Sequence, residues 1–281
     1  MNKKVLAQHG KSIYLAITRV CNQHCLYCPC GKLPSPGESE TAEFFLKLDD
    51  VKKILAAYKQ NAEVCDATIS GGEPTTNPEL GKIVTFLQNS SITVTILTNA
   101  ELFCQEVLLQ SMQDDGVDFS KLNIITTLHS ESAFEHETAN GKQGSFKKSI
   151  TGLQKLIKYG VNVTVKHCLT RRNFQSLVNF YNYVDVTFPI KVDVQLCSID
   201  YAGIPMEKRK AECLSFLELK PYLEAMFEEC IRKDNGRRVY AINMPLCSCD
   251  PYYWNFIVKG KLDYALYSDP VIGQELHTHG E

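Results

Sequence analysis

The chain has 281 residues, of which 44% are hydrophobic and 22% are charged, and its formal net charge is −2. This composition is typical of a globular protein, and the lack of a basic excess disfavours nucleic acid as a partner. No apolar run approaches the roughly 20 residues of a membrane span, so no membrane association is expected. Twelve cysteines without a secretory signal predict a cytoplasmic protein whose thiols bind metal or lie buried.

A cysteine motif follows the first predicted strand, residues 12–18. Cys21, Cys25 and Cys28 form the pattern C-x3-C-x2-C, and three thiolates on one loop can hold an iron–sulfur cluster. Because such clusters usually take four ligands, a [4Fe–4S] cluster held by three leaves one iron free to bind a small molecule. The alternative is zinc with Cys30 as its fourth ligand, although the single residue after Cys28 makes that spacing tight. Residues 29–46 are predicted to form a loop.

A glycine motif follows the second predicted strand, residues 66–70. Between the two strands, apolar spacing over 51–58 predicts a helix with Asp49 or Asp50 as its N-cap. The second strand runs into the segment Gly71-Gly72-Glu73-Pro74. Adjacent glycines allow the backbone to approach a ligand closely and leave its N–H and C=O groups free.

Together these motifs resemble those of the radical S-adenosylmethionine (SAM) superfamily, which carries C-x3-C-x2-C after the first strand and a Gly-Gly-Glu-Pro-like segment after the second. The resemblance implies that the three cysteines hold a [4Fe–4S] cluster whose open iron chelates the amino and carboxylate groups of SAM. An electron from a flavodoxin- or ferredoxin-type donor then cleaves SAM to methionine and a 5′-deoxyadenosyl radical, which abstracts hydrogen from a substrate. The residues from these two motifs that it places at the cofactors are Tyr27, Gly71, Gly72, Glu73 and Pro74.

Predicted helices and strands alternate after the glycine motif. The strands are expected at 92–98, 122–128, 161–168 and 190–196. The helices between them are expected to start at Asn77-Pro78, at Ser145 or its neighbour, and at Asn173, with Gly160 ending the second. This pattern predicts an α/β fold, a partial (β/α)6 TIM-like barrel of parallel strands with a short C-terminal extension, as the resemblance also implies. The strands read as continuous apolar runs, which predicts burial on both faces.

The last third of the chain is predicted to be an extension that packs on the barrel. We expect a barrel core over residues 1–212 and a C-terminal helix and extension over 213–281. The helix is expected over 214–232, with Pro221 at a first-turn position, followed by a strand at 239–243. The aromatic stretch 251–256 is expected to pack on the barrel rather than to line a peptide groove.

Chemistry in a barrel of βα units collects at the carboxyl ends of the strands. By resemblance, Asn99 lies near the methionyl or ribose part of SAM, and Thr127 and His129 face the ribose or the substrate. Lys166 reaches the SAM carboxylate, Leu169 lies near the adenine, and Glu73 accepts a hydrogen bond from the SAM ammonium. His129 and Lys166 are the candidate catalytic residues. The alternatives are structural: a locally bonded hydroxyl for Thr127 and a hydrogen-bonded barrel histidine for His129.

Two further segments bear on the substrate. Residues 128–153 and 242–247 resemble radical SAM enzymes that modify peptides, which predicts a peptide or protein substrate. A small metabolite or nucleotide is the alternative substrate, and a noncatalytic iron–sulfur or zinc protein is the alternative class. Cys247 and Cys249, with Cys197 and Cys30 as helpers, are either ligands of an auxiliary iron–sulfur cluster or ordinary thiols.

Overall fold

The computed structural model describes residues 11–28, 30–31, 33–37, 44–59, 64–199, 213–257 and 266–268. These residues form one sheet of parallel strands in the order β7-β6-β5-β4-β3-β2-β1-β8. The strands are β1 (Lys11–Ala16), β2 (Val64–Ser70), β3 (Thr93–Thr98), β4 (Leu122–Thr127), β5 (Asn162–Leu169), β6 (Asp193–Ser198), β7 (Val239–Ile242) and β8 (Leu266–Ser268). The predicted parallel (β/α)6 arrangement is therefore confirmed, with β7 and β8 added at its two edges.

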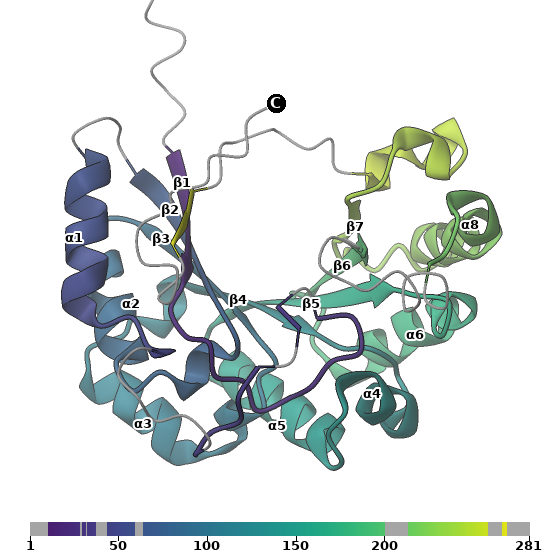
Figure 1. Cartoon of the computed structure of the whole chain (residues 1–281). Coiled ribbons are helices and arrows are strands. Elements are labelled where there is room, and N and C mark those ends of the chain that lie inside the picture. Colours follow the sequence, from purple (N-terminus) through teal and green to yellow (C-terminus); the bar gives the residue numbers. More distant parts are fainter. Residues whose placement is uncertain are drawn as a thin grey trace, which may run out of the picture.

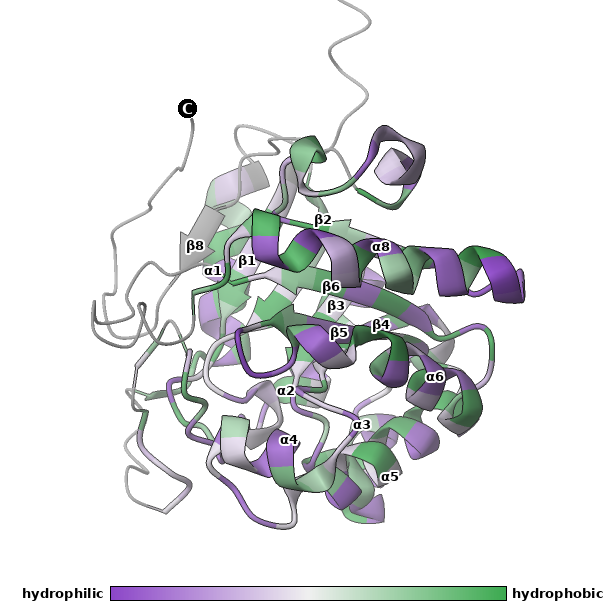
Figure 2. Ribbon diagram, turned by 90° about the vertical axis from the view of Figure 1, so that its right-hand side faces the viewer, coloured by the Kyte–Doolittle hydropathy of each residue, from purple (hydrophilic) through white to green (hydrophobic). Residues whose placement is uncertain are grey.

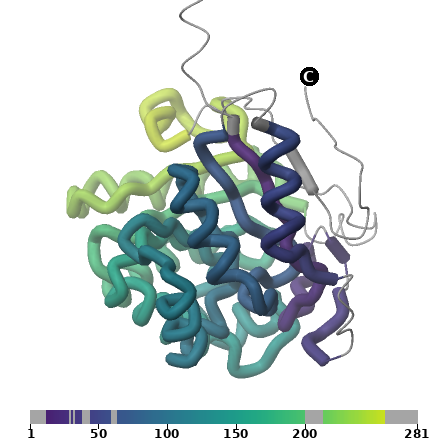
Figure 3. Tube along the Cα trace, turned by 90° about the vertical axis from the view of Figure 1, so that its left-hand side faces the viewer, coloured from purple at the N-terminus to yellow at the C-terminus, as the bar shows by residue number. Residues whose placement is uncertain are grey.

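Helices cover the outer face of this curved sheet (Figure 1). They are α1 (Leu48–Lys59), α2 (Leu80–Asn89), α3 (Glu106–Asp114), α4 (Ala133–Asn140), α5 (Ser145–Lys158), α6 (Leu177–Thr187) and α8 (Phe216–Lys233). Figure 3 shows the N-terminal helices, in blue, lying side by side outside the strands. In the described part of the chain, β7 and β8 are not hydrogen-bonded to each other, so the barrel stays open.

On β3, β4 and β5 the two faces of the strand differ in burial, which corrects the prediction that both faces are buried, whereas β6 is buried at four consecutive positions as predicted. Along β5, Val163, Val165 and Leu169 are buried against the helices, whereas Lys166 and Cys168, on the inner face, are half-buried. Strands β3 and β4 alternate in the same way. The reason is that helices pack on the outer face only, while the inner face of an open barrel keeps contact with solvent. Figure 2 shows the hydrophobic residues concentrated on the strands.

Several predicted helix ends are shifted. Helix α1 starts at Leu48, so Asp49 and Asp50 lie in its first turn, where the helix dipole favours acidic side chains, and neither is the N-cap. Asn77 lies three residues before α2 and ends the short 3-10 turn η2 (Pro74–Thr76). Its Oδ1 accepts a hydrogen bond from Glu79 N (2.8 Å). Asn173 precedes the turn η5 (Phe174–Ser176) without capping it.

Other helix ends match the sequence more closely. Ser145 is the first residue of α5, with Gly144 at the N-cap, and Gly160 follows the helix with φ of +84°. Pro221 lies inside α8 and not in its first turn, because that helix begins earlier, at a capping box formed by Ser215 and Glu218.

The C-terminal segment extends the barrel sheet. Strand β7 pairs in parallel with β6, and α8 packs on α6. In the aromatic stretch, Phe256 stacks on Phe227 with ring centroids 4.3 Å apart and Tyr253 is buried, as the packing prediction requires. Tyr252 and Trp254 are exposed. The boundary at residue 212 stays a prediction. No helix among the described residues is long and apolar enough to cross a membrane.

Candidate active site

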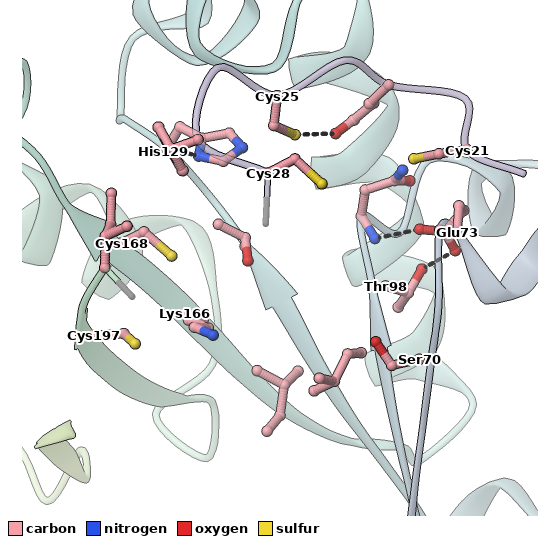
Figure 4. A pocket seen from close by; sticks show the side chains of 18 of the residues that line it. Cys21, Cys25, Cys28, Ser70, Glu73, Thr98, His129, Lys166, Cys168 and Cys197 are labelled. Atoms are coloured by element: carbon pink, nitrogen blue, oxygen red, sulfur yellow. Dashed lines mark hydrogen bonds between the residues drawn. The ribbon is translucent and has the colours of Figure 1, made fainter. Parts of the chain in front are cut away.

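A cavity of about 320 Å³ lies at the carboxyl ends of the strands (Figure 4). Its walls come from the loop after β1, the ends of β2 to β6 and the segment after β7. The lining residues are Cys21, Gln23, Cys25, Tyr27, Cys28, Ser70, Gly72, Glu73, Leu97, Thr98, Asn99, Ile125, Thr127, His129, Lys166, Cys168, Cys197, Ser198, Ile199 and Asn243. The structure thus brings the cysteine motif, part of the glycine motif and the polar strand ends to one site.

The cysteine loop, residues 20–28, is held by backbone hydrogen bonds from two directions. Glu73 N donates to Val20 O (2.8 Å) at the end of β2. On the opposite side, His24 N donates to Asn140 O and Leu26 N donates to Ala139 O, both at 2.9 Å, at the end of α4. These contacts fix the path of the loop across the mouth of the barrel.

Buried side chains secure the same loop at the end of β3. Gln23 Nε2 donates to Glu101 Oε1 (2.7 Å), and Lys142 Nζ lies 2.8 Å from Glu101 Oε2. Glu101 is only 2% exposed, so this carboxylate is a buried anchor with its positive partner in place. Asn99 Nδ2 adds a hydrogen bond to Asn22 Oδ1 (2.7 Å).

The two glycines have a different role from the one predicted for them. A Cβ atom at Gly71 would overlap the backbone of Thr18, and one at Gly72 would overlap the backbone of Val20. Gly71 also has a φ of +132°, a conformation that side chains disfavour. The close backbone approach that requires glycine is therefore to the chain leading into the cysteine loop, although Gly72 also lines the cavity.

The three cysteine thiols differ in pKa. Burial, with repulsion from neighbouring thiolates, raises the pKa of Cys21 and of Cys25 to about 12. A hydrogen bond from the Cys30 side chain lowers the pKa of Cys28 to about 6. Within the described ranges, no three His, Cys, Asp or Glu side chains converge on a point that could hold one metal ion.

Glu73 is 1% exposed and its carboxylate accepts four hydrogen bonds. Oε1 accepts from Thr75 N (3.1 Å), Thr75 Oγ1 (2.6 Å) and Thr98 Oγ1 (2.6 Å), while Oε2 accepts from Asn99 N (2.8 Å). Burial nevertheless raises the pKa of Glu73, and no ion pair joins its carboxylate to another described residue. Oε2, with one donor, retains a lone pair toward the cavity that Glu73 lines.

His129 is a buried, hydrogen-bonded histidine that also lines the cavity. Its Nδ1 hydrogen-bonds the Tyr27 hydroxyl, which ties β4 to the cysteine loop. Burial, followed by repulsion from His136 and His167, lowers the pKa of His129 well below its ordinary value. The imidazole is therefore neutral near pH 7.

The remaining predicted residues form two groups, those that line the cavity and those that do not. Asn99, Thr127 and Lys166 line the cavity, whereas Gly71, Pro74 and Leu169 are not among its lining residues. Leu169, predicted near the adenine, is instead buried in the core between sheet and helices. Successive strand residues point to opposite faces, so the residues that share the inner face with Lys166 are its neighbours two apart.

That period of two also identifies thiols that the sequence did not assign to the SAM site. Cys168 follows Lys166 by two positions on β5, and its register partner on β6 is Cys197, expected only as a helper of an auxiliary cluster. Ser70 and Thr98 end β2 and β3, so the strand-end rule covers them although no role was assigned to them, whereas Gln23 and Asn243 lie outside the strands and carry no comparable signal.

The two cysteines predicted to lead an auxiliary cluster do not share a surface. Cys247 is exposed, while Cys249 is buried in the hydrophobic core. Neither is among the residues that line the cavity.

Comparison with known proteins identifies what this chain is similar to. The sequence profile of the Radical SAM superfamily matches residues 15–184. The chain is 29% identical over 152 residues to a probable GTP 3′,8-cyclase of Methanococcus maripaludis, covering 54% of this chain and 47% of that protein. It is 28% identical over 167 residues to the mycofactocin maturase MftC of Mycobacterium tuberculosis, covering 58% and 39%.

Among solved structures, Streptococcus suis SuiB bound to S-adenosylmethionine has a TM-score of 0.68 at 12% identity, over 96% of this chain and 63% of that one. SuiB bound to precursor peptide SuiA gives a TM-score of 0.65. At such low identity the likeness shows the fold. The chain spans about half the length, or less, of these two curated relatives.

Proposed function

The chain belongs to the radical SAM superfamily, and we propose that it uses a [4Fe–4S] cluster and SAM to abstract hydrogen from a peptide or protein. The observation that carries this proposal is that one cavity gathers all three motif cysteines with an acidic side chain, Glu73, and a basic one, Lys166. When bound, the two cofactors supply a 5′-deoxyadenosyl radical. The chain's own residues bind them, orient them and exclude water.

The cysteines suit a cluster better than the zinc site considered as the alternative. Three thiolates side by side repel one another, and bound iron would offset that repulsion. Burial holds the pKa of Cys21 and Cys25 at about 12, so metal binding must drive their deprotonation. The described residues offer no convergent site for a single ion. A cluster, in contrast, bonds each thiolate to a separate iron.

The charged groups suit the methionyl end of SAM, which carries an ammonium and a carboxylate. Glu73 is a buried carboxylate that forms no ion pair with another described residue, so the SAM ammonium would supply an opposite charge. Lys166 would hold the carboxylate from the opposite wall, where Figure 4 shows it. Asn99 and Thr127 would hydrogen-bond the remaining polar groups. His129 and Lys166 stay the candidate catalytic residues.

A peptide is the favoured substrate class for two reasons. A relative is named a maturase, and a protein of the same fold has been solved with a precursor peptide. The half-buried inner faces of the strands also leave the barrel interior accessible. A small metabolite or nucleotide is the second candidate, because another relative is named a probable GTP 3′,8-cyclase. The flavodoxin- or ferredoxin-type electron donor and the cytoplasmic location stay predictions.

The cluster assignment is tested by comparing Cys25→Ser with Cys30→Ser after anaerobic reconstitution. We expect about four irons per chain in the parent and in Cys30→Ser, and loss of both iron and SAM cleavage in Cys25→Ser. Loss of bound metal in Cys30→Ser would instead favour the four-ligand zinc site. About eight irons in the parent would support the auxiliary cluster at Cys247 and Cys249. A Cys25→Ser protein that cleaves SAM at the parent rate would rule the proposed site out.

A further inference from the structure

Two more thiols lie in the cavity without a role in the proposed function. Cys168 on β5 and Cys197 on β6 are direct partners in the parallel register of these strands, and both line the cavity. Figure 4 shows them with Lys166 on the strand side of the cavity, below the three cysteines of the cysteine loop in this view. Neither forms a disulfide.

Neighbouring groups hold this thiol pair in place. The two side chains hydrogen-bond each other, and Asn243 Nδ2 lies 3.6 Å from Cys197 Sγ, near enough for a weak hydrogen bond. Asn173 Nδ2 donates to Cys168 O (2.9 Å), which fixes the end of β5. Cys168 also packs against the small cluster that contains Tyr27, so it lies beside the cysteine loop.

The spacing of the pair allows a disulfide to form. Neighbouring strands lie about 4.8 Å apart, and a disulfide joins residues whose Cα atoms are about 4.4–6.8 Å apart. Partners in register also point to the same face of a sheet. Cys197 is 4% exposed, while Cys168 is half-buried. Cys168 is thus the more accessible of the two thiols to a molecule in the cavity.

We propose that Cys168 and Cys197 act as a dithiol that returns a hydrogen atom to the substrate radical. This inference rests on the proposed function. The Cys168 S–H bond breaks, a C–H bond forms on the substrate carbon, and Cys168 keeps the unpaired electron. Bond formation with Cys197 then closes the disulfide, releasing one proton to water in the cavity and one electron. A one-electron acceptor of the iron–sulfur class takes the electron, and an external dithiol must reduce the disulfide before the next turnover.

The proposal specifies the class of reaction. Hydrogen removed from one side of a carbon and replaced from a thiol leaves the composition of the substrate unchanged. The product is therefore an epimer and not a crosslinked or methylated species. Lys166 and Cys168 lie on the same face of β5. The proposed hydrogen donor, Cys168, therefore lies next to the residue proposed to hold SAM.

The first test needs no cluster. The cluster-free chain is treated anaerobically with the thiol oxidant diamide, digested and mapped by mass spectrometry. We expect a Cys168–Cys197 linked peptide, and the same link in the control Cys65→Ser, whose thiol lies at the other end of β2. No such link in either protein would overturn the pairing.

The second test uses SAM alone as the probe. The reconstituted chain is incubated with SAM and reductant in D2O, and 5′-deoxyadenosine is analysed for deuterium. Water O–D bonds are too strong to donate deuterium to a carbon radical, so incorporated deuterium reports an exchangeable S–D or phenolic O–D donor in the cavity. We expect deuterium in the parent and in Cys65→Ser, its loss in Cys168→Ala, and deuterium without a disulfide in Cys197→Ser.

The two readouts separate this inference from the proposed function. The total 5′-deoxyadenosine measures SAM cleavage, whereas its deuterium content measures the donor. Unlabelled 5′-deoxyadenosine from the parent, or labelled product from Cys168→Ala, would overturn the donor role while leaving SAM cleavage established. If no variant produced 5′-deoxyadenosine, the proposed function would fail and the donor role with it.

Discussion

Glu73 is the residue at which burial and charge oppose each other most directly. Its carboxylate lies in the interior with four hydrogen-bond donors, yet it forms no ion pair with another described residue and burial raises its pKa. A buried charge without a partner costs free energy, and natural proteins keep such groups mainly where a ligand compensates them. An ammonium group in the cavity would be such a ligand.

Replacing Glu73 with Gln should therefore weaken SAM binding. Glu73→Gln keeps the shape but removes the negative charge, and a hydrogen bond to a charged group contributes about 1.5–3 kcal/mol. Thr75→Val is the matched control, because it removes one donor to the same carboxylate and leaves the charge. Calorimetry on the cluster-loaded, anaerobic proteins would show the loss in Glu73→Gln alone. Equal affinities in parent and Glu73→Gln would place the ammonium elsewhere.

Single residues were predictable where spacing or strand position carries the information. The cysteine and glycine motifs, the strand-end rule and the family resemblance together led to ten of the residues that line the cavity, including His129 and Lys166. Leu169 was misplaced because the assignment ignored the alternation of strand faces. Asn243 could not be predicted from the sequence. It lines the cavity from the segment after β7, in a backbone conformation with φ of 56° that no local sequence pattern indicates.

At the scale of elements, the end of β2 and the cysteine loop form one unit. The chain at Gly71 and Gly72 lies so close to Thr18 and Val20 that no Cβ atom fits between them. The loop is thus positioned by backbone packing, which transmits any change in the glycine turn to the neighbouring Cys21. A substitution there is therefore expected to act on the cysteine loop and not only on the cavity wall at Gly72.

Gly72→Ala should therefore reduce iron content as well as SAM binding. Overpacking of this kind costs about 1–3 kcal/mol in unfolding free energy. Gly160→Ala is the control: Gly160 has φ of +84° and open space where a Cβ atom would lie, so it bears only the backbone cost of about 1–2 kcal/mol. Iron analysis and thermal unfolding would distinguish the two. Full iron loading in Gly72→Ala would mean that the loop adapts.

The elements themselves were largely predictable, and their ends were not. Seven strands, including β7, and the helices α1, α2, α5, α6 and α8 follow from apolar runs and turn residues, whereas α3 and α4 were not predicted. Pro221 was misplaced because the capping box at Ser215 starts α8 earlier, and the tertiary packing of Leu219, Leu223 and Phe227 holds a helix around the proline. Strand β8 was not predicted, since pairing with β1 is a long-range contact.

At the scale of the molecule, one buried arginine ties the C-terminal segment to the barrel. Arg237, just before β7, donates to Val192 O (2.6 Å) and Phe188 O (2.9 Å), and its Nε lies 3.4 Å from Asp185 Oδ1 on α6. Lys233 Nζ is 2.7 Å from the other oxygen of Asp185. Burial acts to raise the pKa of Asp185, but Lys233 and Arg237 outweigh it and lower that pKa.

Asp185→Asn should destabilise the barrel and the C-terminal segment together. We expect a loss of about 2–4 kcal/mol in unfolding free energy, because Arg237 stays buried without its opposite charge. Since the folded pKa of Asp185 is lowered, its stabilisation is full above the unfolded value of about 3.9 and disappears as pH falls through the folded one. Parent and variant should therefore converge below about pH 4.

The matched control is Asp193→Asn, which removes the partner of the exposed Arg238 and should cost at most about 1 kcal/mol. Denaturant unfolding followed by tryptophan fluorescence would report Trp254, the only tryptophan, while circular dichroism reports the barrel. Separate transitions by the two probes would show that residues after 212 fold independently, as the predicted domain boundary would allow.

The alternation of strand faces has a consequence for evolvability. On β5, Val163, Val165 and Leu169 are buried in the core, whereas Lys166 and Cys168 line the cavity. Mutations on the inner face can therefore change the chemistry of the cavity with little loss of core packing. Mutations on the outer face reduce core packing and leave the cavity lining unchanged. A library confined to inner-face positions should retain folded members at high frequency, so this scaffold can acquire new substrates without first acquiring surplus stability.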